Sequence, residues 1–101
     1  MKKILNKSDF DPYLNSKFEI SHKETGSINA ELVKIESWDK DITEGFSLLF
    51  KGPKDNIMPH DILRLKHNKI GDFDLFMGPV VYPEQDGIYY EAIFNNLKEN
   101  N

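Results

Sequence analysis

The chain has 101 residues, a formal net charge of −4 at pH 7 and no cysteine. A chain of this length supports one domain with one core, so we treat residues 1–101 as a single β-rich domain with flexible ends at 1–7 and 96–101. Because phosphate binding needs a clustered cationic surface, the negative charge and the single arginine, Arg64, argue against nucleic acid as a partner. The absence of cysteine excludes disulfides and thiolate chemistry.

The start of the chain carries no export or membrane signal. Two lysines are followed by only two apolar residues, Ile4 and Leu5, whereas a signal peptide needs roughly 7–15. No apolar run approaches the roughly 20 residues of a membrane helix. We therefore expect a cytoplasmic protein that does not bind membranes, and leave open export by a route that uses no signal peptide.

One short helix is predicted near the beginning. Ser8 is suited to an N-cap, and Phe10, Tyr13 and Leu14 fall on one side at helical spacing. The pattern predicts a helix over 9–15 whose apolar stripe covers one end of a sheet.

The next two segments alternate between apolar and polar residues. Residues 18–22 predict a half-buried strand, and residues 28–38 resume the same period after a turn at 23–27. The alternation changes phase near Leu32-Val33. Since an extra residue in one strand produces such a change, we expect a β-bulge there.

Two aromatic-rich strands, 46–51 and 88–95, place large side chains on both faces. In the first, Phe46, Leu48 and Phe50 point inward by parity and Leu49 points outward. In the second, Tyr89 and Ile93 lie on the less buried parity. If the two strands are neighbours, Leu49, Tyr89 and Ile93 form one apolar patch.

Residues 62–67 and 72–77 flank a turn at 68–71 and predict a β-hairpin. Leu63 and Leu65 share one face of its first strand, and Ile62 lies opposite. We find no internal repeat. Six or seven short strands with one short helix predict a mainly β fold, either a small antiparallel sandwich or a partly open barrel.

A set of positions from the predicted helix to the last strand follows one recognisable pattern: Phe10, Phe18, Phe46-Ser47-Leu48-Leu49-Phe50-Lys51-Gly52-Pro53, His67, Gly71, Leu75-Phe76, Pro79 and Tyr90-Glu91-Ala92-Ile93-Phe94-Asn95. In these positions the chain resembles a family of small, uncharacterised bacterial β-proteins, a domain of unknown function. Gly45 stands where the family pattern usually has proline. The resemblance implies no catalytic residue. Members are similar to proteins found alongside phage-tail-collar-like or surface-fibre genes.

Candidate metal and nucleophile motifs are weak. His22, His60 and His67 lack the close spacing of a compact metal motif. Ser47 has no Gly-x-Ser-x-Gly context. We therefore expect no metal site, no cofactor and no catalytic residue.

Three carboxylates are the remaining candidates for chemistry. Asp72 and Asp74 share one strand face, which we interpret as solvated, with Lys66 or Lys69 nearby. We expect Glu91 to contact Arg64 or a lysine. A hydrolase or isomerase that uses Glu91, His60 or the aspartate pair stays the least favoured alternative.

The surplus of aromatic and apolar groups points to an interface. We name Leu49, Tyr89, Ile93, Trp38 and Tyr82 as candidate interaction residues, against the alternative that they form a second core layer. The sequence thus predicts a non-enzymatic interaction or structural accessory module that binds a protein partner or self-associates. The family resemblance adds a phage-tail-like or surface-fibre assembly. A small-ligand-binding barrel, with its ligand unknown, is the alternative.

Overall fold

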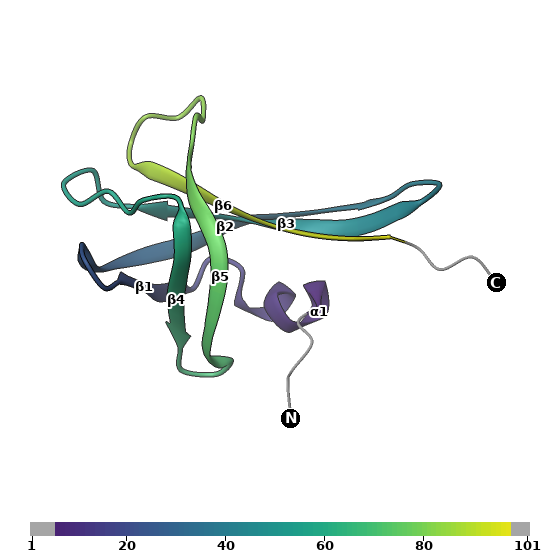
Figure 1. Ribbon diagram of the computed structural model, residues 1–101, viewed down its shortest axis with the longest axis horizontal. Coiled ribbons are helices and arrows are strands. Elements are labelled where there is room, and N and C mark those ends of the chain that lie inside the picture. Colours follow the sequence, from purple (N-terminus) through teal and green to yellow (C-terminus); the bar gives the residue numbers. More distant parts are fainter. Residues whose placement is uncertain (1–5, 98–101) are drawn as a thin grey trace.

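The computed structural model describes residues 6–97, so most of the predicted flexible ends at 1–7 and 96–101 lies outside the described residues (Figure 1). The elements are a short helix, a 3₁₀ turn and six strands: α1 (Lys7–Phe10), η1 (Asp11–Tyr13), β1 (Lys17–His22), β2 (Gly26–Asp39), β3 (Thr43–Gly52), β4 (Asp61–His67), β5 (Gly71–Val80) and β6 (Ile88–Leu97). No helix of this described region is long and apolar enough to cross a membrane.

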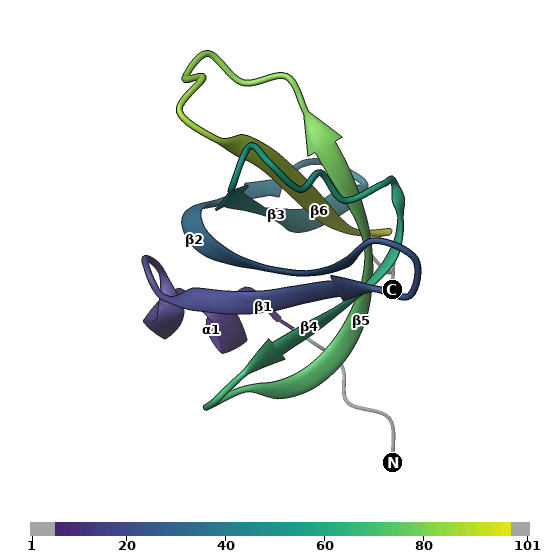
Figure 2. The same cartoon turned by 90° about the vertical axis from the view of Figure 1, so that its left-hand side faces the viewer.

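The strands form a closed antiparallel barrel in the order β1-β2-β3-β6-β5-β4 (Figure 2). The β1–β4 ladder, with Ile20 opposite Leu65, closes it. The prediction of a mainly β fold with one short helix is confirmed, and the architecture is a closed barrel of six strands. Closure leaves each strand with one face toward the core and one toward the outside.

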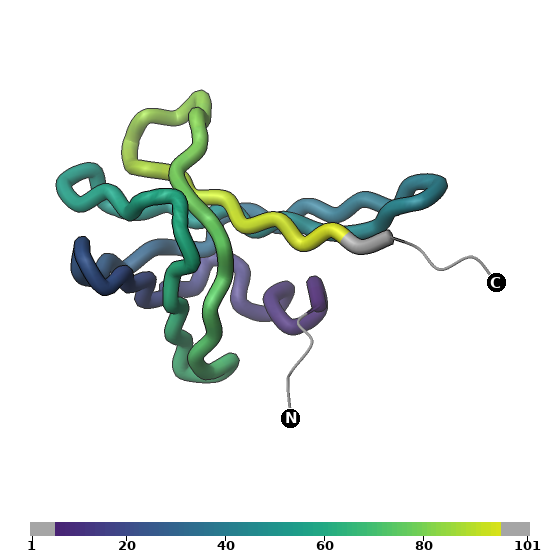
Figure 3. The backbone as a smooth tube through the Cα atoms, viewed as in Figure 1, coloured from purple at the N-terminus to yellow at the C-terminus, as the bar shows by residue number. Residues whose placement is uncertain are grey.

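The predicted bulge in β2 is confirmed. Leu32 pairs with Phe50 and Lys34 with Leu49, so Val33 is the extra residue. Beyond this point β2 no longer pairs with β1 and pairs only with β3, which in turn pairs with β6. We call this extension the arm, made of residues 33–39, 43–48 and 92–97. It projects from the barrel in Figures 1 and 3.

The barrel interior is filled by its own side chains. Phe18, Leu48, Phe50 and Tyr90 are fully buried. The hydroxyl oxygen of Tyr90 accepts a hydrogen bond from the backbone N–H of Met58 at 2.9 Å, which satisfies the one polar group of that ring. The core is therefore a packed hydrophobic cluster.

The helix begins earlier than predicted. Its N-cap is Asn6, whose backbone N–H donates to the Asp9 carboxylate at 2.7 Å. The helix gives way to η1, in which Pro12 occupies the first turn, and the chain turns at Asn15 with φ of 72°. The expected helix over 9–15 is thus a shorter helix followed by a single 3₁₀ turn.

The expectation that this segment covers one end of the sheet is met by Phe10. This side chain is fully buried, and its ring centroid lies 6.0 Å from that of Phe46, 5.7 Å from that of Phe73 and 6.0 Å from that of Phe94. Phe46 and Phe94 themselves stack at 4.4 Å. This aromatic cluster joins the arm to β5.

The two hairpin turns that join β1 to β2 and β4 to β5 are built alike. The backbone N–H of Glu24 donates to Nδ1 of His22, and that of Lys69 donates to Nδ1 of His67. Each histidine pairs with a glycine at positive φ four residues later. The two turns therefore share the short pattern His-x-x-x-Gly.

Candidate interaction surface

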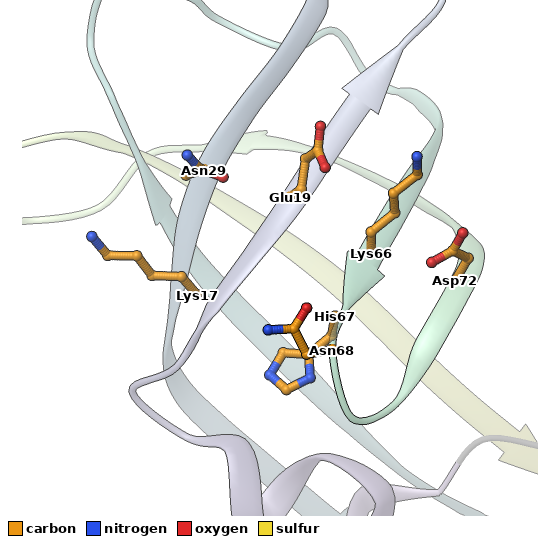
Figure 4. Close-up of a pocket in the computed structure, with 7 residues that line it drawn as sticks. All are labelled: Lys17, Glu19, Asn29, Lys66, His67, Asn68 and Asp72. Atoms are coloured by element: carbon orange, nitrogen blue, oxygen red, sulfur yellow. The ribbon is translucent and has the colours of Figure 1, made fainter.

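The outer side of β1, β2, β4 and β5 carries charges of opposite sign in register, and we call it the charged face. Lys17 lies opposite Glu31 and Glu19 opposite Lys66. A pocket of about 410 Å³ lies on this face. Figure 4 shows the side chains that line it: Lys17, Glu19, Asn29, Lys66, His67, Asn68 and Asp72. Two lysines face two carboxylates in this pocket, so it holds no surplus of positive charge for an anion.

Asp72 and Asp74 belong to the charged face, as expected. Asp72 lies opposite Lys66, and Asp74 lies opposite Arg64 with its carboxylate 2.6 Å from the Arg64 Nε. We expected Glu91 to contact Arg64 or a lysine, but among residues 6–97 neither forms an ion pair with it. The physical reason is the strand order: β5 lies between β4 and β6, so Arg64 meets Asp74 first.

Ser16 and His67 lie close together in the arrangement of a possible nucleophile and base. Oγ of Ser16 is 3.1 Å from Nε2 of His67. However, Nδ1 of the ring accepts the Lys69 N–H, which assigns the proton to Nε2. The ring therefore donates to Ser16, whose hydroxyl donates to the Tyr13 carbonyl at 2.6 Å. A general base must accept the serine proton, so this contact is structural.

His22 is similarly engaged through both ring nitrogens. Nδ1 accepts the Glu24 N–H, and Nε2 donates to the Asp61 carboxylate at 2.9 Å. This hydrogen bond is the main cause that lowers the pKa of Asp61 below its usual value. The His60 ring packs directly against the backbone of Gly78. Among residues 6–97, no three metal-binding side chains gather at one place.

The expected patch of Leu49, Tyr89 and Ile93 is only partly on the surface. The three share the outer parity of β3 and β6. Leu49 is 7% exposed and Tyr89 is 6% exposed, whereas Ile93 is 61% exposed. Leu49 lies in register between Lys34 and Glu91, whose aliphatic stems can cover it. Of the three, Ile93 alone presents a large apolar surface.

Tyr89 is held beneath the loop that joins β5 to β6. Its ring stacks on that of Tyr82 with centroids 4.3 Å apart. Its hydroxyl donates to Asp86 at 2.8 Å, and this bond is the main reason that the pKa of Tyr89 rises to about 12. Nζ of Lys51 donates to the same carboxylate at 2.6 Å. This network fastens the loop to β3.

The Tyr82 side of this loop borders a groove of about 600 Å³, which we call the loop groove. Its lining is mainly apolar and includes Ile57, Val80, Val81, Tyr82 and Ile88, with Lys54 and Glu84 also present. The exposed position of Val81 is conspicuous for a valine.

Trp38 lies near the tip of the arm. Its indole N–H donates to Oδ1 of Asn95 at 3.0 Å. A Cβ on Gly45 would come within 2.8 Å of the indole Cζ2, so the ring crosses β3 where that strand has no side chain. The five predicted interaction residues are therefore distributed over the arm, the outer wall of β3 and β6, and the loop groove.

Among the exposed apolar residues that were missed as interaction candidates, two are neighbours. Ile62 is 62% exposed and Phe76 is 68% exposed, and they are direct partners in the β4–β5 ladder. The ladder between β5 and β6 ends at the pair Gly78 and Glu91. Just past that end lie Phe76, two residues before Gly78, and Ile93, two residues after Glu91. We call Ile62, Phe76 and Ile93 the apolar row. The signal was parity, because Ile62 and Phe76 alternate with buried leucine and methionine.

The comparisons with known proteins bear on the family and on nothing finer. No curated protein and no solved structure gives a significant match. The sequence pattern of one family matches residues 5–94, which is most of the chain. The chain belongs to the family DUF6916, described as a domain of unknown function.

Proposed function

We propose that this domain is a protein-interaction module that binds a partner protein through the apolar row. The observation that carries the proposal is the exposure of three large apolar side chains, 62% for Ile62, 68% for Phe76 and 61% for Ile93. Scattered single apolar residues are normal on a surface. Here, Ile62 and Phe76 are direct ladder partners, and Ile93 lies on the same outer face of the barrel, two residues beyond the last β5–β6 pair.

The charges near the apolar row indicate the chemistry of the partner. Glu91 lies on the outer face of β6, two residues from Ile93, and has no ion-pair partner among residues 6–97. The chain as a whole carries a net charge of −4. A matching partner presents apolar side chains with lysine or arginine beside them, because opposite charges set orientation and speed association.

We extend the proposal to a structural accessory role, as in a phage-tail-like or surface-fibre assembly. The support for this extension is the family resemblance of the segments 46–53 and 90–95. A closed barrel with large apolar side chains exposed on its outer face suits a component that holds other proteins together.

The test begins with site-specific photocrosslinking in the cells that produce the protein. A photoreactive phenylalanine analogue at position 76 should capture one partner, whereas the same analogue at Glu19, on the charged face, should not. The captured protein is then purified and its affinity measured. Phe76→Asp should weaken binding roughly tenfold to a hundredfold, since burying such a side chain contributes about 1.5–3 kcal/mol.

The control is Glu19→Ala, which should leave the affinity unchanged. Circular dichroism and the melting temperature of both variants should match those of the wild type. Equal affinity of Phe76→Asp and wild type for the captured partner would overturn the proposal.

A second candidate function is the binding of a small apolar ligand in the loop groove. Its volume of about 600 Å³ falls within the roughly 300–1,000 Å³ of typical ligand sites. The barrel interior, in contrast, is occupied by Phe18, Phe50 and Tyr90. A thermal-shift screen tests this candidate: a ligand that stabilises the wild type but not Tyr82→Ala supports it, and a screen without such a ligand counts against it.

A further inference from the structure

The arm has two open strand edges that differ in composition. Residues 33–39 of β2 and 92–97 of β6 each pair with β3, and the described part of the chain places no second strand beside either segment. The β2 segment carries Lys34, Glu36 and Asp39. The β6 segment, Ala92-Ile93-Phe94-Asn95-Asn96-Leu97, contains neither charge nor proline.

This difference matters because an open edge is a template for another strand. Proteins protect such edges with charged residues or proline, which make pairing costly. The β2 segment has that protection, and Lys34 and Glu36 also form an ion pair at 3.5 Å. The six residues of the β6 segment include no charged residue and no proline. They do include a β-branched and an aromatic residue, which favour strand pairing. The β6 edge is therefore the one available for pairing.

We propose that the β6 edge pairs antiparallel with the β6 edge of a second copy of this chain. An antiparallel pair of identical strands has a two-fold axis, so one surface serves both partners and the assembly closes as a dimer. Because residues 92–97 carry no charge, pairing two copies of this segment brings no like charges together, whereas pairing two β2 segments would. The two arms would then form one sheet in the order β2-β3-β6-β6-β3-β2.

The proposed dimer does not rest on the proposed function. It uses the backbone edge of β6, whereas two of the three residues of the apolar row, Ile62 and Phe76, lie on β4 and β5. Either proposal can therefore fail without the other. Asn95→Asp tests the dimer, and Phe76→Asp tests the apolar row.

Asn95→Asp is the sharpest variant for the dimer. It keeps an oxygen that can accept the Trp38 indole N–H, and it places a negative charge on the edge of each copy. Like charges that meet across paired strands oppose pairing. The matched control is Ser37→Asp, which adds the same charge to the β2 edge.

The experiment is light scattering on the full chain as the protein concentration is raised. Wild type and Ser37→Asp should approach twice the 11.8 kDa of one chain, while Asn95→Asp stays at 11.8 kDa. Phe76→Asp should still dimerise. Hydrogen exchange adds a local readout. In the wild type, the amides of residues 92–97 should exchange more slowly as the protein concentration rises and the dimer forms. In Asn95→Asp, their exchange should not change with concentration.

Two results would overturn the inference. One is a wild-type chain that stays monomeric at every concentration. The other is a dimer that survives Asn95→Asp with unchanged exchange in 92–97, because its interface would then lie elsewhere. Loss of partner binding by Phe76→Asp, with the dimer intact, would confirm that the two surfaces act separately.

Discussion

The charged face and the apolar row lie on the outside of the same barrel and differ in how their side chains are satisfied. On the charged face, opposite charges meet across strands, as Arg64 meets Asp74 and Glu19 meets Lys66. On the apolar row, Ile62, Phe76 and Ile93 extend into solvent. Because these three side chains are largely exposed, they add little to the stability of the domain, and this is why we propose that a partner binds them.

The largest expected effect comes from removing the support that both regions share. Phe10→Ala deletes a fully buried ring that contacts the rings of Phe46, Phe73 and Phe94. We expect a loss of about 3–5 kcal/mol in the free energy of unfolding. Urea denaturation followed by circular dichroism measures it. A loss well below 1 kcal/mol would show that Phe10 does not anchor the arm to β5.

A smaller loss is expected from a change in the arm alone. In Gly45→Ala, the new Cβ would overlap the backbone carbonyl oxygen of Phe94 and press on the Trp38 ring. Overpacking of this kind costs about 1–3 kcal/mol. Tryptophan fluorescence should shift along with the unfolding midpoint. An alanine variant with wild-type stability and fluorescence would contradict the contact between Trp38 and β3.

Phe76→Asp separates the two regions most clearly. Because the side chain is exposed, its replacement should change the free energy of unfolding by no more than about 0.5 kcal/mol. Its partner affinity should nevertheless decrease, while Glu19→Ala on the charged face should change neither quantity. If Phe76→Asp instead unfolds the protein, the row belongs to the folding of the domain.

The charged face should contribute little to stability. Arg64→Ala breaks a half-exposed ion pair with Asp74, and such surface pairs contribute about 0–1 kcal/mol. The loss should shrink further at high salt, since salt screens exposed charges. A loss in the free energy of unfolding well above 1 kcal/mol that does not depend on salt would contradict this assignment as a surface ion pair.

The pH dependence reports on the His67 turn. Burial, followed by the nearby Lys69, lowers the pKa of His67, so the folded state favours the neutral ring. Its contribution to stability is therefore present above the unfolded pKa of about 6.5 and is lost as the pH falls through the folded value. His67→Gln should remove part of the stability change below neutral pH. If the difference in the free energy of unfolding between wild type and His67→Gln does not vary with pH, His67 is not the source of the pH dependence.

Local patterns predicted much of the fold. Alternation identified Phe46, Leu48 and Phe50 as inward, and the phase change near Leu32 predicted the bulge. Closure of the barrel was not predictable, because the β1–β4 and β3–β6 ladders join residues far apart in sequence. The helix limits were displaced because Asn6, and not Ser8, provides the cap.

The surface was harder to predict than the core. Parity places Leu49 and Ile93 alike, yet Leu49 is buried and Ile93 is exposed. What differs is the neighbouring strand: Leu49 lies between Lys34 and Glu91, whereas Ile93 lies beyond the point where β5 ends its pairing with β6. Such neighbours are set by register across distant strands. The ion pair of Arg64 with Asp74 lies within the predicted hairpin, but the expected turn at 68–71 did not define which residues of the two strands are opposite each other.

The most direct test of the central claim is the affinity of the crosslinked partner for three proteins: the wild type, Phe76→Asp and Glu19→Ala. We predict that Phe76→Asp binds roughly tenfold to a hundredfold more weakly, while Glu19→Ala binds as the wild type does and all three remain folded. Equal binding by the wild type and Phe76→Asp would contradict it.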